Sequence, residues 1–288
     1  MIGRHYPQFA DADRPYHALL EGVIARQADL VARWLLVGFI HGVMNTDNTS
    51  ISGETIDYGP CAFMDHYDPA MVFSSIDELG RYAYANQPRI ALWNLTRFAE
   101  CLLPLLADEQ DKAIEQAQSA LGEFAESFNA AYQAGLRKKL GLFTARDDDF
   151  VLAQDLLDAM AKNHADFTLT FRRLSDTALA PDDSGVRQLV ADPTAYDEWA
   201  VRWRQRISEE MQDPATRQSA MRLVNPAFIP RNHRIEAVID AAINRDDFAP
   251  FEELLTVLSK PYEDQPAFAS YAEPPEPHQR VLQTFCGT

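Results

Sequence analysis

Cysteine and positive charge are both scarce in this sequence. Only three cysteines occur among 288 residues, Cys61, Cys101 and Cys286, and their wide spacing fits neither a zinc site nor a disulfide scaffold. The 26 lysines and arginines are outnumbered by 43 aspartates and glutamates, which gives a net charge of −17. Because such an acidic chain repels phosphate backbones and anionic lipid, we expect no nucleic-acid partner and no membrane partner. An anionic substrate would then need a metal ion to hold it.

Long apolar runs and a targeting signal are also missing. No run of 18 apolar residues occurs, and the N-terminal MIGRHYPQFADADRP has neither the basic start nor the apolar core of a signal peptide. We therefore expect a cytoplasmic globular protein. Hydrophobic residues make up 47% of the chain, which is enough for a sizeable core.

Apolar residues at helical spacing are abundant. From Pro15 they recur every three or four positions as far as Leu35, and Gly38 is expected to end this helix. The same spacing predicts further helices near 89–106, 108–140, 148–164, 194–212, 232–244 and 248–259. Residues 176–193 and the Pro-rich segment from Pro261 onward are predicted to be loops, the second an extended strap. The chain is therefore predicted to be mainly α.

One segment, FIHGVMNTDNTSISGETIDYGP, concentrates polar side chains between apolar runs. Within it, the β-like runs Thr49–Ser52 and Glu54–Ile56 lie on either side of Gly53, which predicts a tight hairpin. Folding this hairpin would bring Asn48 and Asp57 together at its open end.

An amide oxygen and a carboxylate at that end suit Mg²⁺, which prefers one or two protein carboxylates, with nucleotide phosphates and water completing its octahedron. Asn48 and Asp57 therefore predict half of a magnesium–nucleotide site. The alternative is that both residues only cap the hairpin and its turns, where Asn and Asp are common.

The same segment matches the catalytic frame of protein kinases with one substitution. His41-Gly42 followed by Asn48 fits the HGDxxxxN loop of kinase-like phosphotransferases, and Asp57-Tyr58-Gly59 takes the place of the DFG turn. Val43 stands where the catalytic base should be, and an acid occurs instead at Asp47. A kinase without its base should transfer phosphate poorly, so the chain either lacks activity or performs other chemistry.

Four ordered motifs carry a family resemblance: HGVMNTDN, DYGP, GRYAYANQPRIALWNL and NPAFIPRN. Together they resemble the selenoprotein O (SelO, YdiU or UPF0061) family over essentially the whole chain. The resemblance implies a protein-kinase-like fold that binds ATP in a flipped orientation and transfers AMP to Ser, Thr or Tyr hydroxyls of proteins. It also implies that Asp47 is the base and that Asn48 and Asp57 bind Mg²⁺ or Mn²⁺, with ATP as co-substrate.

The chain departs from the family pattern at its start. Members also hold the nucleotide through an N-terminal lobe with a glycine-containing loop, a lysine and a glutamate, whereas here the first lysine is Lys112 and RHYP looks like an interior segment. We therefore expect a kinase-like C-lobe with one small β-hairpin over 1–144, a helical extension over 145–260 and a Pro-rich tail over 261–288, with the N-lobe absent. The alternatives are a kinase-like phosphotransferase and a truncated lobe without catalysis. The sequence leaves open whether Met1 is the natural start.

Residues around the site are expected to support it. His41 is expected to be structural. Arg231 and Asn232 are expected to cap a helix, to join a buried polar network or to contact the substrate, and neither is assigned a catalytic role. The loop residues Arg81, Tyr82, Asn86 and Gln87 are expected to hold the site in place, and the tryptophans Trp34, Trp93, Trp199 and Trp203 to lie in the core. Some members of the family carry a cysteine or selenocysteine near the end, which makes a disulfide between Cys61 and Cys286 a hypothesis. Its alternative is a pair of ordinary reduced thiols.

Overall fold

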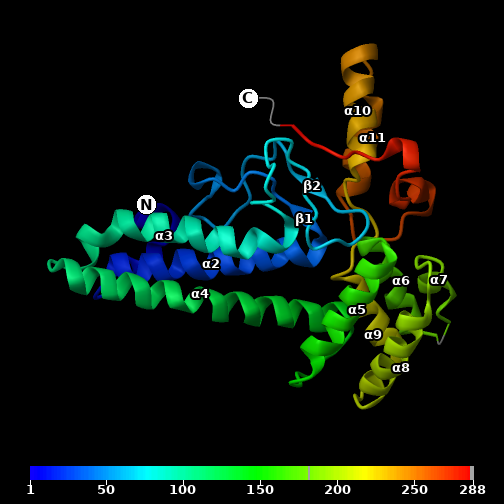
Figure 1. Cartoon of the computed structure of the whole chain (residues 1–288), viewed down its shortest axis with the longest axis horizontal. Coiled ribbons are helices and arrows are strands. Elements are labelled where there is room, and N and C mark those ends of the chain that lie inside the picture. The colour runs from blue at the N-terminus through cyan, green and yellow to red at the C-terminus, as the bar shows by residue number, and fades with distance from the viewer. Residues whose placement is uncertain (181, 286–288) are drawn as a thin grey trace.

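The computed structural model describes residues 1–180 and 182–285, and most of its regular structure is helical (Figure 1). The α-helices are α1 (Ile2–His5), α2 (Pro15–Val37), α3 (Gln87–Leu106), α4 (Gln110–Lys139), α5 (Asp149–Asn163), α6 (Phe167–Thr177), α7 (Ser184–Arg187), α8 (Thr194–Ser208), α9 (Pro214–Arg222), α10 (Asn232–Arg245) and α11 (Ala249–Leu258). Short 3-10 turns are η1 (Pro7–Phe9), η2 (Thr46–Asn48), η3 (Tyr84–Asn86), η4 (Pro266–Ala272) and η5 (Pro277–Gln279). The prediction of a mainly α chain is confirmed.

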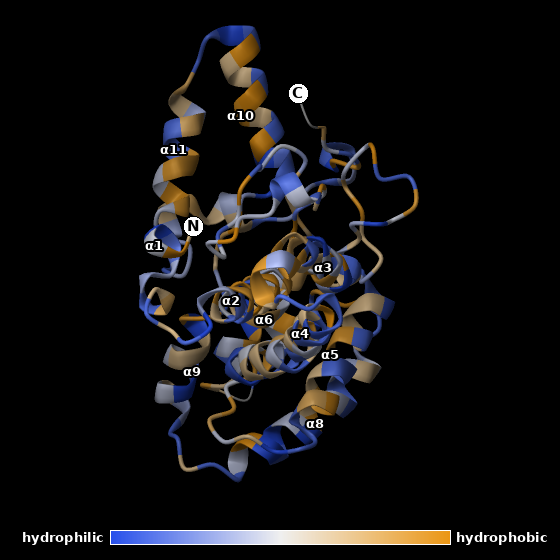
Figure 2. Cartoon of the chain, turned by 90° about the vertical axis from the view of Figure 1, so that its left-hand side faces the viewer, coloured by the Kyte–Doolittle hydropathy of each residue, from blue (hydrophilic) through white to orange (hydrophobic). Residues whose placement is uncertain are grey.

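The three longest helices, α2, α3 and α4, lie side by side, and their buried residues form one part of the hydrophobic core. Their apolar faces meet between the helices, as Figure 2 shows in a view along them. Gly38 ends α2 as predicted, because it adopts the left-handed conformation (φ +74°) and its N–H donates to Leu35 O.

A second group of helices, α5 to α9, packs at one end of the long helices (Figure 1). Trp199 and Trp203 are buried and stacked at its centre, and their indole N–H groups donate to Leu152 O and Leu140 O. Trp34 is also buried, so the core prediction is wrong only for Trp93, which is 43% exposed.

The predicted positions of the strands are wrong. The only sheet in the described part of the chain pairs β1 (Phe39–Ile40) with β2 (Ala62–Phe63) in antiparallel register, outside the predicted runs 49–52 and 54–56. Polar groups of those two runs form hydrogen bonds with side chains of α2 instead. Gln27 Nε2 donates to Ser50 O, and Trp34 Nε1 donates to Thr55 Oγ1. These contacts with a helix replace the pairing that local sequence favours.

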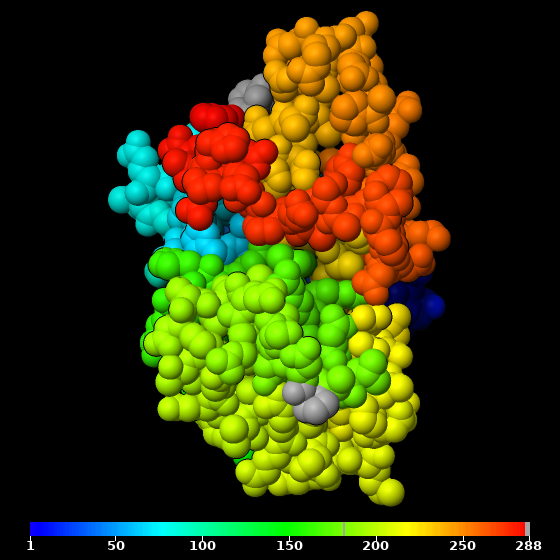
Figure 3. Space-filling view, turned by 90° about the vertical axis from the view of Figure 1, so that its right-hand side faces the viewer, coloured from blue at the N-terminus to red at the C-terminus, as the bar shows by residue number. Residues whose placement is uncertain are grey.

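The C-terminal segment, residues 261–285, crosses the molecule as a strap as predicted, but it is not extended throughout, because it includes the 3-10 turns η4 and η5. Figure 3 shows it in red, running between the helical hairpin α10–α11 and the body of the protein. Near its end, Thr284 N donates to Phe73 O, Ser75 N donates to Thr284 O, and Thr284 Oγ1 donates to Pro60 O. None of the helices in the described ranges is both long and apolar enough to cross a membrane.

Candidate functional site

The two-stranded sheet brings the kinase-like motifs together. β1 runs directly into HGVMNTDN and β2 follows DYGP, so both motifs extend from the same end of the sheet. His41 Nε2 donates to Ile56 O at 2.9 Å, and Gly42 lies against the backbone of Pro60. The connection between the motifs therefore folds back on itself through the pairing of β1 with β2, and not through the tight hairpin around Gly53 that was predicted.

Asn48 and Asp57 present oxygens at the surface of this loop. Asn48 Nδ2 donates to Val43 O at 3.1 Å, which leaves the amide oxygen available to a cation. Asp57 is exposed and adopts the left-handed conformation (φ +56°), with its Oδ1 accepting only a long bond (3.4 Å) from Gly59 N. One amide oxygen and one carboxylate are a donor set that suits Mg²⁺ when phosphate oxygens supply the other ligands.

Asp47 lies beside Asn48 in η2 and is exposed. Its carboxylate has no hydrogen-bond or ion-pair partner among residues 1–180 and 182–285. No cluster of three or more His, Cys, Asp or Glu in the same residues could hold a metal by itself. The roles of Asp47, Asn48 and Asp57 remain predictions.

Polar side chains of α3 fix the backbone of the loop. Gln87 is buried, accepts from His41 N (3.0 Å) and donates to Phe39 O (2.9 Å). Asn94, two turns along the same helix face, donates to Met44 O at 3.0 Å. Gln87 was expected to support the site. Asn94 was missed, and the available signal was a polar residue on the apolar face of a predicted helix.

The other residues of that motif divide into two groups. Tyr82 OH donates to Asn45 Oδ1 at 2.7 Å, which ties it to the loop as expected. Asn86 bonds to Gly80 O within its own segment, and the Arg81 guanidinium lies 4.9 Å from the ring of Trp93. These last two residues shape the segment that precedes α3.

The environment of His41 agrees with a structural role. The ring is 1% exposed, and burial lowers the pKa of His41 even though the bond to Ile56 O opposes this shift. A buried neutral imidazole that donates Nε2–H to a carbonyl fixes the loop and cannot reach a substrate.

A buried ion-pair network supports β2 from behind. Arg231 is 1% exposed, and its Nη1 contacts Asp65 Oδ1 (2.5 Å) and Asp166 Oδ2 (2.8 Å). Asn232 Nδ2 donates to Phe63 O at 3.1 Å. Of the three interpretations of Arg231 and Asn232, this geometry fits the buried polar network.

Cys61 lies between the turn that carries Asp57 and strand β2. Burial, together with the negative charge of Asp57, raises the pKa of the Cys61 thiol to about 11. The thiol is therefore protonated at neutral pH and is a weak nucleophile. The hypothesis of a disulfide with Cys286 concerns a residue outside the described ranges, so it stays a prediction.

The close approach of Gly42 to Pro60 predicts that Gly42→Ala destabilises the protein by about 1 to 3 kcal/mol. Gly42 has φ +85°, and an added Cβ would lie 2.8 Å from Pro60 O, a backbone atom. The loss is measured as the change in the free energy of unfolding in urea.

Gly122→Ala is the matched control for this change. Gly122 lies in α4, and an added Cβ would meet no atom within 4 Å. This substitution is expected to stabilise the protein by about 0.5 to 1 kcal/mol, because alanine favours helix. Equal effects of the two substitutions would contradict the role of Gly42 in the loop.

Comparison with known proteins identifies the family to which the chain belongs. A family described as "Protein adenylyltransferase SelO" matches residues 1–259, and the chain belongs to this family. The chain is 72% identical over 288 residues to the protein nucleotidyltransferase YdiU of Bradyrhizobium diazoefficiens, and 68% identical over 289 residues to that of Rhodopseudomonas palustris strain BisB5. Both alignments cover 100% of this chain and 59% of the relative.

Proposed function

We propose that the chain is part of a protein adenylyltransferase, which moves AMP from ATP to Ser, Thr or Tyr hydroxyls of proteins. The observation that carries the proposal is the loop after β1, where Asp47, Asn48 and Asp57 all lie at or near the surface. By contrast Val43, at the position of a kinase base, is buried and 6% exposed. The names of the family and of the relatives support the same chemistry.

In this mechanism Asn48 and Asp57 would hold Mg²⁺ or Mn²⁺ against the phosphates of ATP. The bound ion would neutralise charge on the phosphates. Asp47 would accept the proton of the target hydroxyl as its oxygen forms a bond to the α-phosphorus, and the bond to pyrophosphate breaks. Gln87 and Asn94 would keep the loop backbone in place during the reaction.

We further propose that residues 1–144 form the C-lobe of a kinase-like fold, that 145–260 form a helical extension and that 261–288 form the tail. The loop between β1 and β2, supported by α2 and α3, supports the first assignment. Since the chain spans 59% of the length of these relatives, the experiments below use the protein with all the sequence that its gene encodes.

The decisive measurement compares ATP labelled at the α-phosphorus with ATP labelled at the γ-phosphorus. We expect label from the α-position to enter protein in the presence of Mg²⁺ or Mn²⁺, and no label from the γ-position. Asp47→Ala is expected to slow incorporation by roughly 100-fold or more, because it removes the proton acceptor. Glu54→Ala, which changes an exposed acid elsewhere in the loop, is the control and is expected to have no effect.

Two outcomes would contradict adenylylation. Incorporation of γ-label alone would favour the kinase-like phosphotransferase. Incorporation of neither label, in protein that binds ATP and a metal ion, would favour a binding module without catalysis.

A further inference from the structure

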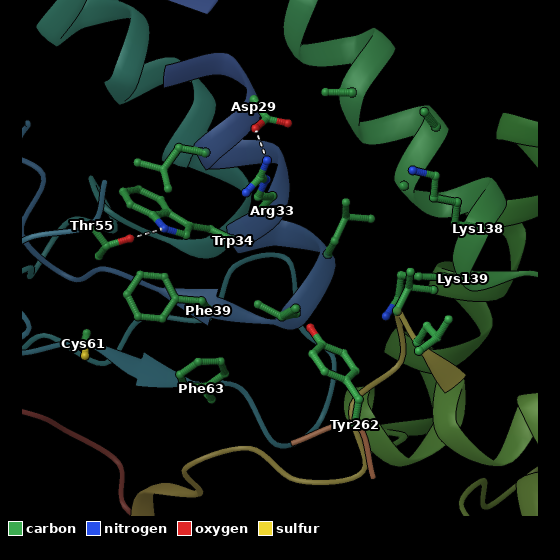
Figure 4. Close-up of a pocket in the computed structure, with 18 of the residues that line it drawn as sticks. Asp29, Arg33, Trp34, Phe39, Thr55, Cys61, Phe63, Lys138, Lys139 and Tyr262 are labelled. Atoms are coloured by element: carbon green, nitrogen blue, oxygen red, sulfur yellow. Dashed lines mark hydrogen bonds and ion pairs between the residues drawn. The ribbon is translucent and has the colours of Figure 1, made fainter. Parts of the chain in front are cut away.

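A pocket of about 770 Å³ lies beside the candidate site, between α2, α4 and the two-stranded sheet (Figure 4). Aromatic rings of Trp34, Phe39 and Phe63 form one wall, and Tyr262 of the strap closes the far side. A volume of this size with a largely apolar lining is typical of small-molecule sites.

The charges in this pocket are unusual for so acidic a chain. Among the described residues that line it, the only acid is Asp29, which is already paired with Arg33 at 2.6 Å. The last turn of α4 adds Lys138 and Lys139, and neither amino group has a hydrogen-bond or ion-pair partner in the part of the chain that the structure describes. The pocket is thus locally positive in a chain of net charge −17.

Lys139 is the strongest indication of a ligand. Its side chain is 2% exposed, and its Nζ lies 4.1 Å from the centre of the Phe171 ring and 5.3 Å from that of Phe167. These cation–π contacts offset part of the cost of burial but supply no counter-ion. Figure 4 shows the amino group of Lys139 in the pocket, on the side of Tyr262. A lysine at the end of a helix is favoured by the helix dipole, but this effect needs no burial and explains only the exposed Lys138.

Burial of this group without a counter-ion carries a cost. It lowers the pKa of Lys139 from the ordinary 10.5 to about 7. A ligand that brings a negative charge would remove much of this cost, because an opposite charge nearby favours the protonated amine.

We propose that this pocket binds an anionic amphiphile, a molecule with an apolar body and one carboxylate or phosphate group. The apolar body would lie against Trp34, Phe39 and Phe63, and the anionic group would bind Lys139, with Lys138 at the opening. The site is separate from the proposed transfer of AMP and does not depend on it. Its wall includes Thr55, Tyr58 and Cys61, so a bound ligand would touch the rear of the loop that carries Asp57.

The test is a fluorescence titration of the whole encoded protein with cis-parinaric acid and with its methyl ester. We expect the acid to bind about tenfold or more tightly than the ester, since only the acid forms a charge-assisted bond with Lys139. Lys139→Met should remove this difference by weakening the acid and leaving the ester unchanged. Competition with laurate and with dodecyl phosphate then shows whether carboxylate or phosphate is the preferred group.

One further variant and one further measurement make the result specific. Lys112→Met changes an exposed lysine of α4 outside the pocket and is expected to leave both affinities unchanged. Lys139→Met is itself expected to be more stable than the parent at neutral pH, because the unfolded chain keeps this lysine charged in water, whereas the folded chain buries it. Thermal melts therefore separate loss of binding from unfolding.

Equal affinity for acid and ester, or acid binding that survives Lys139→Met, would overturn the proposal. Absence of binding by the whole encoded protein would also overturn it, and would indicate that protein covers the pocket.

Discussion

Replacing Arg231 with methionine is expected to lower the free energy of unfolding by about 3 to 5 kcal/mol, the usual cost of removing one partner from a buried ion pair. The Arg231 side chain is almost fully buried and contacts the carboxylates of Asp65 and Asp166. Without it, two carboxylates face each other in a site largely shielded from water. Urea denaturation at neutral pH would measure the loss.

Two comparisons test whether the network causes this loss. Arg245→Met removes an ion pair with Asp240 in which both side chains are more than half exposed, and is expected to cost less than about 0.5 kcal/mol. Adding Asp65→Asn and Asp166→Asn to Arg231→Met should restore part of the stability, because no unpaired charge then remains. Similar losses for Arg231→Met and Arg245→Met would show that the buried network contributes no more to stability than an exposed ion pair.

Asp57→Ala is expected to weaken Mg²⁺-dependent ATP binding by about 100-fold or more, if Asp57 supplies the only carboxylate ligand of the ion. Asp47→Ala is expected to leave binding within about threefold of the parent, since a base acts on the target hydroxyl and not on the metal. Calorimetric titrations with ATP, in the presence of Mg²⁺ and of EDTA, would measure both effects.

The informative result is the difference between the effects of Asp47→Ala and Asp57→Ala on ATP binding. Glu54→Ala serves again as a control for a general loss of negative charge in the loop. Equal loss of binding in Asp47→Ala and Asp57→Ala would remove the case for Asp47 as a base. Unchanged binding in both would remove the metal site from this loop.

The sequence predicted the helices best where packing follows a regular apolar pattern. All of the predicted helices are present, and α2 stops at Gly38 because a left-handed residue is needed there. Four helices in the described ranges were missed: α6 in an unassigned stretch, α9, and the one-turn helices α1 and α7. The prediction of a loop over 176–193 is therefore wrong where α7 lies. The buried face of α6 includes the polar residues Thr170, Arg172 and Ser175, which interrupt the apolar spacing that predicts a helix. The Arg172 guanidinium is buried because it donates to backbone carbonyls, among them Tyr262 O far along the sequence.

In the polar loop, too, features set by neighbouring residues were predicted, and features set by residues distant in the sequence were not. Residue types and spacing indicated Asp47, Asn48 and Asp57, because a motif is a local property of the sequence. The strands were misplaced because Gln27 and Trp34, far earlier in the chain, bond to the segment that was expected to pair. Likewise, no local sequence pattern predicts that Arg231 forms an ion pair with Asp65.

The contact between Arg231 and Asp65 also has a consequence for the order of folding. It joins positions 166 residues apart, so closing it costs far more chain entropy than forming a turn of helix. Helices α3 and α4 follow one another directly in the sequence and can associate early, as local contacts generally do. The bond from Asn232 to Phe63 O in β2 spans a similar separation, so we expect it to form late as well. A partly folded chain would therefore display the acidic loop before its rear support exists, and this stage is where we expect the protein to be most exposed to misassembly.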